Sequence, residues 1–472
     1  MLGKQLLTRR ELIRASILTA TGAALAACGA TPAPTSTSAP PAEATSAPAA
    51  EPTATAAPAA TAGEKVAIRW QDFPDFEPFW PRIQEALAQA LPNISVEFQP
   101  MNYDAWGEKL LAAMTAGVAP DVFCSWEPES GKFAEKRTVL DLEPYVERDF
   151  SAELTDDFFK WQMDGLIAHD GSIRYGLPHY VNIVVLYYSK AAFDEVGIAY
   201  PTRDLTYDDY ATWLAKLTKR EGDQVKRWGG SMPINTERVT PHLQAWGGHM
   251  VNPDDWTECW LGKKEAQDAL EWIRVRMWDE NSFAQPVQLQ GVGQASGAQV
   301  GPWASGMLGS AEDGMGNLAY YANESKFDWD IIDMPTGPAR RATLGTTDAH
   351  LITKASKHAE EAWQFTKWMT DEFYQTIIME AWGGIPVRYS FLAKWKEQVV
   401  KTYPVLGKVN LDVVPNALKE GYPMVSERFK KPAEADTEVV AGYEKLFSVG
   451  DTPVAYMQQV ADTVTTINRA QE

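Results

Sequence analysis

The central part of the sequence alternates between strand-like runs and helical stripes. Short runs of β-branched and aromatic residues at 66–70, 94–98 and 122–124 predict three strands. Between these runs, apolar residues recur every three to four positions over 77–91 and 104–116, which predicts two helices. Strands that alternate with helices favour an α/β fold with a mostly parallel, doubly wound sheet.

Ligands of such sheets lie outside the carboxyl ends of the strands. The first and third predicted strands therefore bring residues 71–73 and 125–127 to one mouth. Further elements are predicted, a strand at 183–188 and helices at 207–217, 265–278 and 360–370. No internal repeat of 20 to 50 residues is visible, which leaves solenoids and propellers without support.

Residues 1–28 are expected to form an export signal. The paired Arg9 and Arg10 resemble a twin-arginine signal, although Leu12 stands where Phe is usual, so Sec export remains the alternative. The following apolar stretch, 15–27, is too short to span a bilayer. The sequence Leu-Ala-Ala before Cys28 resembles a lipobox, which predicts a mature chain that begins with a lipidated Cys28.

Residues 29–63 consist mainly of Ala, Pro, Thr and Ser and contain no aromatic or large aliphatic side chain. Such a segment cannot bury enough surface to offset the entropy of ordering, which predicts a disordered tether. The tether can reach at most roughly 110 Å, at about 3.1 Å per residue. A formal net charge of -20 argues against nucleic-acid binding and against docking on anionic lipid, so only the N-terminal lipid is expected to contact the membrane.

Common catalytic and metal-binding motifs are absent from the sequence. There is no GxxxxGK[ST] phosphate loop, no GxSxG nucleophile motif, and no HExxH among the six histidines. We therefore predict no catalytic residue, no metal site and no cofactor. The chain contains 63 acidic residues, so a glycosidase-type carboxylate pair stays an open alternative.

Several short motifs occur in a fixed order along the chain. These are AMTAG at 113–117 with PDV at 120–122, YGLP at 175–178 with LYYSK at 186–190, WGG at 246–248, SGM at 305–307, PTGP at 335–338, SK at 356–357 with EAW at 361–363, and GGIPVR at 383–388. This order resembles family 1 of the extracellular solute-binding proteins of ABC importers, the maltose-binding-protein-like group. Ser189 departs mildly from the family pattern, where Asn is usual.

The resemblance implies a type II periplasmic-binding-protein fold, a two-lobed clamp in which each lobe is a mostly parallel sheet flanked by helices. The first lobe would comprise 64–180 and 343–392, and the second 181–342 and 393–472. Such a protein would be a lipid-anchored monomer on the extracytoplasmic face of the cell membrane. It would capture a carbohydrate, expected to be an oligosaccharide, by closing its hinge, and would deliver it to a membrane permease. An amino acid, peptide or polyol ligand and a surface glycoside hydrolase remain the alternatives.

A sugar offers an apolar ring face and a rim of hydroxyls, which suit aromatic plates surrounded by carboxylates, amides or cations. Mapping onto the cleft segments of the family selects the following ligand-binding candidates: Trp70, Asp72, Trp126, Glu127, Asn182, Asn235, Glu237, Trp246, Glu312, Asp313, Asp348, Trp382, Tyr422 and Arg428. Core packing remains the alternative for Trp70 and Trp246. A solvated rim remains the alternative for Glu127, Glu312 and Asp313.

Two cysteines, Cys124 and Cys259, remain in the body of the chain. The resemblance assigns them to different lobes, where a disulfide would prevent the clamp from opening. We therefore predict that both are free or buried.

Overall fold

The computed structural model describes residues 65–102, 106–126, 129–289, 300–346, 348–420, 423–425 and 427–470. The predicted signal, Cys28 and the tether lie outside these ranges, as do Glu127 and Tyr422. Within them, no helix combines the length and the apolar character that a membrane span requires.

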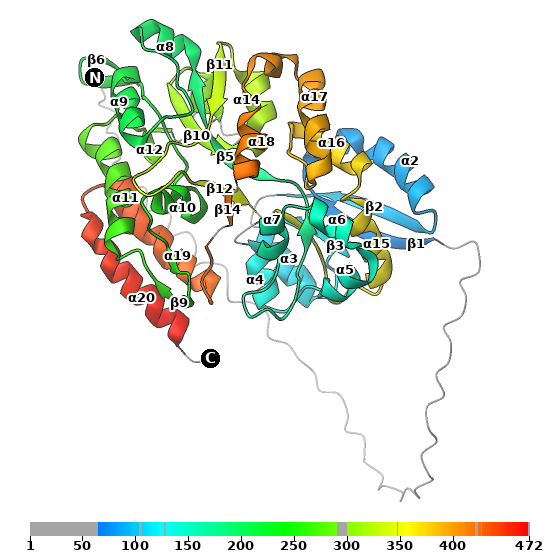
Figure 1. The fold of residues 1–472 in the computed structure, drawn as a ribbon. Coiled ribbons are helices and arrows are strands. Elements are labelled where there is room, and N and C mark those ends of the chain that lie inside the picture. The colour runs from blue at the N-terminus through cyan, green and yellow to red at the C-terminus, as the bar shows by residue number, and fades with distance from the viewer. Residues whose placement is uncertain are drawn as a thin grey trace, which may run out of the picture. The chain divides into compact units, whose positions relative to one another are not determined.

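The first sheet has five strands in the order β2-β1-β3-β13-β4, and Figure 1 labels β1, β2 and β3 among them. Its strands are β1 (Val66–Asp72), β2 (Ile94–Pro100), β3 (Val122–Ser125), β4 (Leu177–Pro178) and β13 (Ala349–Ile352). Strand β1 runs parallel to β2 and β3, as the alternation of strands and helices predicts. Strand β13 runs antiparallel to both β3 and β4.

The second sheet follows the order β10-β5-β12-β14, with β11 also paired to β5. Its strands are β5 (Asn182–Ser189), β10 (Ser310–Gly314), β11 (Trp329–Ile332), β12 (Thr343–Thr346) and β14 (Pro423–Val425). Strands β10, β11 and β12 are antiparallel to β5, and only β12 and β14 are parallel. The α/β class is confirmed, but the expectation of a mostly parallel second sheet is wrong, because β5 enters this sheet from the first one and the chain returns beside it.

The chain passes between the two sheets three times. It leaves the first sheet through residues 179–181, between β4 and β5, returns between β12 and β13, and passes again after β13 to reach β14 of the second sheet. Residues 343–346 pair with β5 and β14, so they belong to the second sheet and not, as expected, to the first lobe. The buried Gln162 amide donates to the Tyr180 carbonyl at 2.6 Å and to the Thr346 carbonyl at 3.4 Å, which ties the first two passages together.

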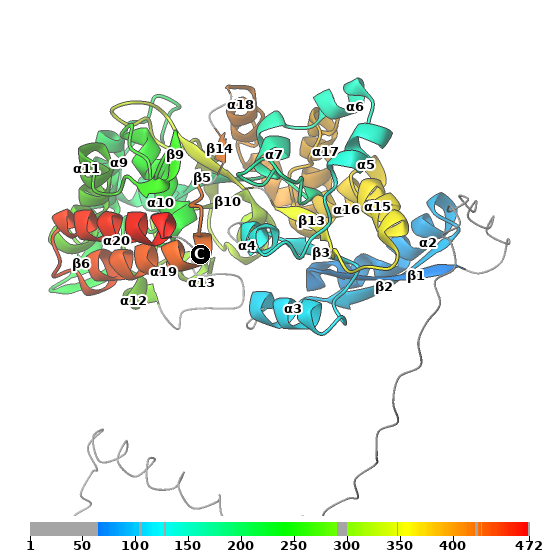
Figure 2. The same ribbon diagram turned by 90° about the horizontal axis from the view of Figure 1, so that it is seen from below.

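Helices from two separate stretches of the sequence, residues 80–165 and 359–382, cover the first sheet (Figure 2). They are α2 (Trp80–Ala90), α3 (Trp106–Thr115), α4 (Glu129–Glu135), α5 (Glu143–Asp149), α6 (Ala152–Asp157), α7 (Lys160–Gly165), α15 (Ala359–Trp368) and α16 (Glu372–Trp382). Successive strand residues point to opposite faces, so Val122 packs in a core with α2, α15 and α16, whereas Phe123 packs against α3. The sheet is therefore buried on both faces.

The predicted helix at 77–91 begins later than expected. Residues Pro74–Phe79 form a 3₁₀ turn, and α2 starts at Trp80 with Pro81 in its first turn. Proline has no N–H to donate, which disfavours the helix interior but suits the first turn. Pro78 and Pro81 therefore shift the start of the helix.

The second sheet is covered by a further group of helices. They are α8 (Lys190–Val196), α9 (Tyr207–Leu217), α10 (Thr236–Ala245), α11 (Lys264–Arg274), α12 (Pro286–Leu289), α13 (Val300–Ala304), α14 (Leu318–Glu324), α17 (Leu392–Thr402), α18 (Val413–Glu420), α19 (Pro432–Tyr443) and α20 (Met457–Arg469). Two hairpins complete the fold, β6 (Lys219–Glu221) with β7 (Gln224–Arg227) and β8 (Val251–Asn252) with β9 (Asp255–Cys259). Leu186 and Tyr188 pack in one core and Val185 and Tyr187 in the other, so β5 is buried on both faces.

Candidate ligand-binding site

A cavity of about 210 Å³ lies among the segment after β1, the end of α16, and the first residues of β5 and α10. Its lining comprises Phe73, Asp75, Tyr180, Asn182, Arg238, Gly316, Asn317, Tyr320 and Trp382. Both halves of the molecule contribute to it. The residues after β1 and at the end of α16 supply mostly rings, and those of β5, α10 and α14 supply mostly polar groups.

The aromatic wall is a corner made of three rings. The Trp382 ring lies nearly perpendicular to those of Phe73 and Tyr180, with centroid separations of 5.9 and 5.4 Å. Helix α16 ends at Trp382 because Gly383 adopts a φ of 77°, which glycine tolerates without strain. Only 5% of the Trp382 surface is exposed, so neighbouring side chains fix the position of its ring. The corner offers an apolar surface to one face of a ligand.

The polar wall is organised around Asn182 and Arg238. Asn182 is the first residue of β5, and its Oδ1 accepts a hydrogen bond of 3.0 Å from the Gly316 N–H. Arg238 lies in the first turn of α10, where the Asn235 side chain caps the helix by accepting from the Arg238 N–H at 2.8 Å. The buried Arg238 Nη1 has no hydrogen-bond partner among the described residues. Since a buried donor is costly to leave unpaired, Arg238 favours a ligand that presents an acceptor.

The lining also contains a carboxylate, Asp75. Tyr320 of α14 donates from its hydroxyl to Asp75 Oδ1 at 3.0 Å, and this bond joins the second half of the molecule to the segment after β1. The cavity therefore presents an acceptor and a donor of opposite charge from its two halves.

A buried carboxylate, Asp313, lies behind the polar wall at the end of β10. It accepts hydrogen bonds from the Gly314 N–H at 2.7 Å and from Asn317 Nδ2 and the Tyr321 hydroxyl, each at 3.0 Å. Burial raises the pKa of Asp313, and the positive charge of Arg238 opposes that rise. Asp313 thus holds Asn317 in place and also influences the charge balance of the cavity.

A second buried cluster lies behind the aromatic wall. His350 Nε2 lies 2.7 Å from Asp72 Oδ2, and Cys124 Sγ lies 3.2 Å from His179 Nδ1. Burial lowers the pKa of His179, and the neighbouring His350 lowers it further. Burial raises the pKa of the Cys124 thiol, as do the nearby charges of Asp72 and Asp348. Phe73 stacks on His179 at 5.7 Å, so this cluster supports the aromatic corner.

The sequence model of the family of bacterial extracellular solute-binding proteins matches residues 71–376, about two thirds of the sequence. The chain belongs to this family. The maltotriose-binding protein of Pyrococcus abyssi is 24% identical to this solute-binding protein over 392 residues, which cover 76% of this chain and 79% of the relative.

Solved solute-binding proteins share the fold. An ABC substrate-binding protein from Listeria monocytogenes, solved with cycloalternan, aligns with a TM-score of 0.74 at 22% identity, covering 86% of this chain and 99% of that one. UgpB from Mycobacterium tuberculosis, solved with glycerophosphocholine, aligns with a TM-score of 0.69 at 18% identity, covering 86% and 98%. At these identities the likeness establishes the type II fold and not the ligand.

Several predicted ligand contacts of this solute-binding protein lie in its interior instead. Trp70 is fully buried and donates to Asp72 at 3.1 Å, and Trp246 packs against Tyr207 at 4.7 Å, so core packing explains both indoles. Asp72 itself is buried beneath the cavity, with no exposed surface. Glu312 is buried and lies 2.7 Å from His242 Nε2, which removes it from the rim. Trp70, Asp72 and Glu312 share one cause, because each lies on a strand that is covered on both faces, whereas Trp246 is half-buried at the end of α10.

Other predicted residues lie near the cavity or elsewhere in the fold. Trp126 stacks between Trp106 and Phe73, at 5.1 and 6.3 Å, and therefore lies directly behind the aromatic corner. Asp348 is buried and accepts from the Thr346 hydroxyl. Asn235 caps α10, and Glu237 lies half-buried beside Arg238. Arg428 donates to the Gly165 carbonyl at 2.8 Å and to the Tyr175 hydroxyl. Of the predicted residues that the structure describes, only Asn182 and Trp382 line this cavity.

The sequence analysis missed four polar or aromatic residues of the cavity: Asp75, Arg238, Asn317 and Tyr320. Each lies within a few positions of a predicted residue. Asp75 follows Asp72, Arg238 follows Glu237, and the other two follow Asp313. The predicted segments therefore adjoin this cavity, and the signal that was overlooked is that loop and helix-start residues, rather than strand ends, face a cavity of this kind.

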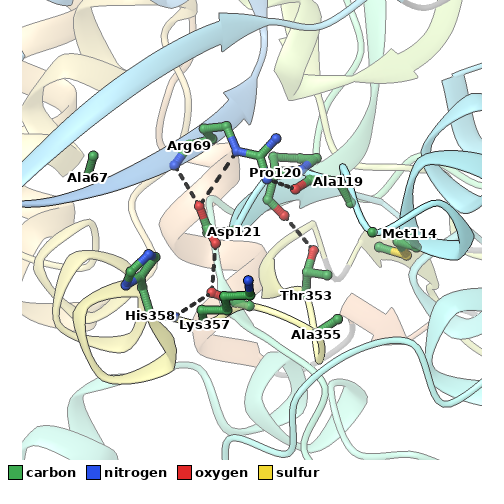
Figure 3. A pocket seen from close by; sticks show the side chains of 12 residues that line it. Ala67, Arg69, Met114, Ala119, Pro120, Asp121, Thr353, Ala355, Lys357 and His358 are labelled. Atoms are coloured by element: carbon green, nitrogen blue, oxygen red, sulfur yellow. Dashed lines mark hydrogen bonds and ion pairs between the residues drawn. The ribbon is translucent and has the colours of Figure 1, made fainter.

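A second cavity, of about 240 Å³, lies at the other end of the inner strands of the first sheet, where β3 begins and β13 ends (Figure 3). Asp121 there accepts from the Arg69 N–H at 2.8 Å and from the Ser356 hydroxyl at 2.7 Å. The Thr353 hydroxyl donates to the Pro120 carbonyl at 2.6 Å. These polar groups satisfy one another, and their bonds fix the segments that flank β3 and β13. This cavity therefore has a structural explanation.

Proposed function

We propose that the protein is the substrate-binding lipoprotein of an ABC importer and that it binds a carbohydrate in the cavity lined by Asn182, Arg238 and Trp382. The observation that carries this proposal is the pairing of an aromatic corner with a charged donor and a charged acceptor. A sugar ring can stack on the rings while its hydroxyls donate to Asp75 and accept from Arg238.

Capture by closure follows from the origin of the cavity residues. Asp75 and Trp382 belong to the half that contains the first sheet, whereas Asn182 and Arg238 belong to the other half. A ligand contacts all of them only when the halves are close together, and that differential affinity is what shifts the equilibrium to the closed form.

A neutral polyhydroxy ligand fits the charges of the cavity better than an anion does. Asp75 would repel a phosphate or carboxylate, and Asp313 already compensates part of the Arg238 charge. An amino acid, a peptide or a polyol remains the second candidate, since the UgpB structure holds glycerophosphocholine. A glycoside hydrolase is the least supported, because the relatives named above are binding proteins.

Delivery and location complete the proposal. The lipidated Cys28 would anchor the monomeric protein to the extracytoplasmic face of the membrane through the tether at 29–63. The closed, loaded form would then dock on the permease subunits. Metabolic labelling with a fatty acid tests the anchor, because a Cys28→Ser variant should lose the label.

The decisive experiment is a thermal-shift screen of the protein against mono- and oligosaccharides, amino acids, peptides and polyols. A ligand at 100 times its dissociation constant should raise the free energy of unfolding by about 2.7 kcal/mol. A shift with amino acids or peptides alone would overturn the sugar assignment. Turnover of an aryl glycoside would favour the hydrolase, and saturable binding without turnover supports the binding protein.

A further inference from the structure

Four metal-ligating side chains meet beneath the aromatic corner. Asp72 is the last residue of β1, Cys124 lies in β3, His350 lies in β13, and His179 directly follows β4. None of them is more than 1% exposed. Adjacent strands of the first sheet therefore bring two imidazoles, a carboxylate and a thiol to one dry location.

The distances among three of these side chains suit a single ion. Asp72 Oδ2 lies 2.7 Å from His350 Nε2 and 4.0 Å from His179 Nε2, and the ligand atoms of all three residues lie within 4.8 Å of one another. An ion bound at about 2.0–2.2 Å allows two ligands to be up to about 4.4 Å apart. Small side-chain shifts would therefore let one ion contact all three.

Neighbouring groups hold these ligands in position. Cys124 Sγ lies 3.2 Å from His179 Nδ1, and a hydrogen on that nitrogen would leave the Nε2 lone pair directed at Asp72. The Phe73 N–H donates to Asp72 Oδ1 at 2.8 Å, and Trp70 Nε1 donates to Oδ2. Metal-binding imidazoles and carboxylates usually have such supporting bonds.

The charge of the cluster also calls for a cation. A buried carboxylate needs a counter-charge, and the only ion-pair partners of Asp72 among the described residues are His179 and His350. We propose that Asp72, His179 and His350 bind a divalent transition metal, with Zn²⁺ as the expected ion and Cys124 as its supporting neighbour. Imidazole ligands favour Zn²⁺ over the oxygen-seeking Mg²⁺ and Ca²⁺.

No motif in the sequence indicates this site, because Asp72 and His350 are 278 positions apart. The site also has a structural consequence for the cavity. Phe73 and Trp382 pack on His179, with centroids at 5.7 and 6.1 Å. A metal ion on His179 would fix the imidazole that supports both rings of the aromatic wall.

The molecule contains a matched control for this proposal. His242 Nε2 and Glu312 Oε2 form another buried pair, also 2.7 Å apart, in the second half of the molecule. This pair is not part of a group of three close ligand atoms among the described residues. A His242→Gln variant therefore removes an equivalent imidazole without removing a proposed ligand.

The experiment measures metal content by mass spectrometry in purified protein that has been unfolded, refolded with Zn²⁺ or Mg²⁺, and dialysed. Refolding is needed because the cluster is fully buried. We expect about one Zn²⁺ per chain in the wild type and in His242→Gln, and at least tenfold less in His179→Gln and His350→Gln. Refolding with Co²⁺ should give the visible absorption of a bound ion in the wild type, a readout that does not depend on any variant folding.

Three results would overturn the proposal. A wild-type protein that retains no metal and shows no Co²⁺ bands would mean that only a proton holds the Asp72–His350 pair. Zn²⁺ retained equally by His179→Gln and His350→Gln would place the ion elsewhere, for example on surface carboxylates. Equal retention of Mg²⁺ and Zn²⁺ would contradict the ligand chemistry.

Discussion

The two walls of the cavity differ in where their charges are compensated. Behind the aromatic wall, Asp72 is paired with His350 and receives further hydrogen bonds inside the core, so this wall presents only rings to the ligand. Behind the polar wall, Asp313 is compensated in part by Arg238, whose guanidinium also lines the cavity. The charge behind the first wall is therefore compensated within the core. The charge of Arg238 in the second wall is compensated only in part and remains available to a ligand. Changes to the first wall should act through packing, and changes to the second through charge.

The largest effect is expected from Trp382→Ala in the aromatic wall. Removing a buried tryptophan should lower the free energy of unfolding by about 3–5 kcal/mol, because it leaves a cavity beside Phe76 and His179. Ligand affinity should fall as well. Trp395→Ala is the matched control, since Trp395 is equally buried but is not part of the cavity lining. Unfolding in urea and calorimetric titration would separate the two effects, and unchanged affinity in Trp382→Ala would remove this ring from the site.

Arg238→Met should weaken binding. A hydrogen bond to a charged donor contributes about 1.5–3 kcal/mol, which corresponds to roughly 10- to 150-fold in affinity. Stability should fall less than in Trp382→Ala, because Nη1 has no hydrogen-bond partner to lose among the described residues and the variant removes only the charge that compensates Asp313. The measurement is titration calorimetry with the ligand from the screen. A large loss of stability with intact affinity would contradict the difference between the walls.

The same variant should change the pH dependence of stability. The pKa of Asp313 is raised in the folded state, so its stabilising contribution is present below pH 3.8 and is lost as the pH rises through the folded pKa. Without Arg238 that pKa rises further, and the loss continues to higher pH. The gap in unfolding free energy between the variant and the wild type should therefore widen between the folded pKa of Asp313 in the wild type and the higher folded pKa in the variant, by at most about 1.4 kcal/mol per pH unit. A gap that is constant with pH would mean that Arg238 does not act on Asp313.

Asn235→Ala should separate a cap from a contact. Asn235 accepts from the Arg238 N–H at the start of α10, so its removal should cost about 0.5–2 kcal/mol of stability. Ligand affinity should stay within a factor of about three, since a cap acts only through the helix. A selective loss of affinity would restore Asn235 to the ligand site.

The smallest effect is expected at the two thiols. Both cysteines are free and buried, as predicted, and burial raises the pKa of Cys259 to about 12. Thiols in such positions are protonated and poorly accessible at neutral pH. We expect no alkylation of the native protein and two alkylated residues in its body after denaturation, measured by intact mass. Rapid labelling of native Cys124 would show that the core behind the aromatic wall opens readily.

The sequence predicted the first sheet better than the second. Period-two and period-3.6 patterns locate β1, β2 and β3 and their helices, and the parallel pairing follows from the alternation. The direction of β5 and the strands paired with it depends on where the chain passes between sheets, which no local pattern encodes. Strand β12 illustrates this. The sequence analysis assigned residues 343–346 to the first lobe, whereas they pair with β5 and β14 of the second sheet.

For the site, the sequence identified segments but not side-chain directions. Asn182 and Trp382 line the cavity as expected, whereas Trp70 does not, because β1 is covered on both faces and its aromatic side chain enters the core. Phe73 and Asp75 lie beyond the end of β1, where side chains are no longer packed on both sides. Arg238 could have been inferred from the cap at Asn235, but only if the direction of the first turn of α10 had been known.

The Gln162 amide has a mechanical consequence. It donates to the carbonyls of Tyr180 and Thr346, one in each of the first two passages of the chain between the sheets. Two connecting segments that are joined at one point cannot twist independently. The two halves can therefore rotate relative to each other mainly about one axis. The opening motion of the protein should then follow one reproducible path, and a Gln162→Leu variant should broaden the range of open conformations rather than favour any one of them.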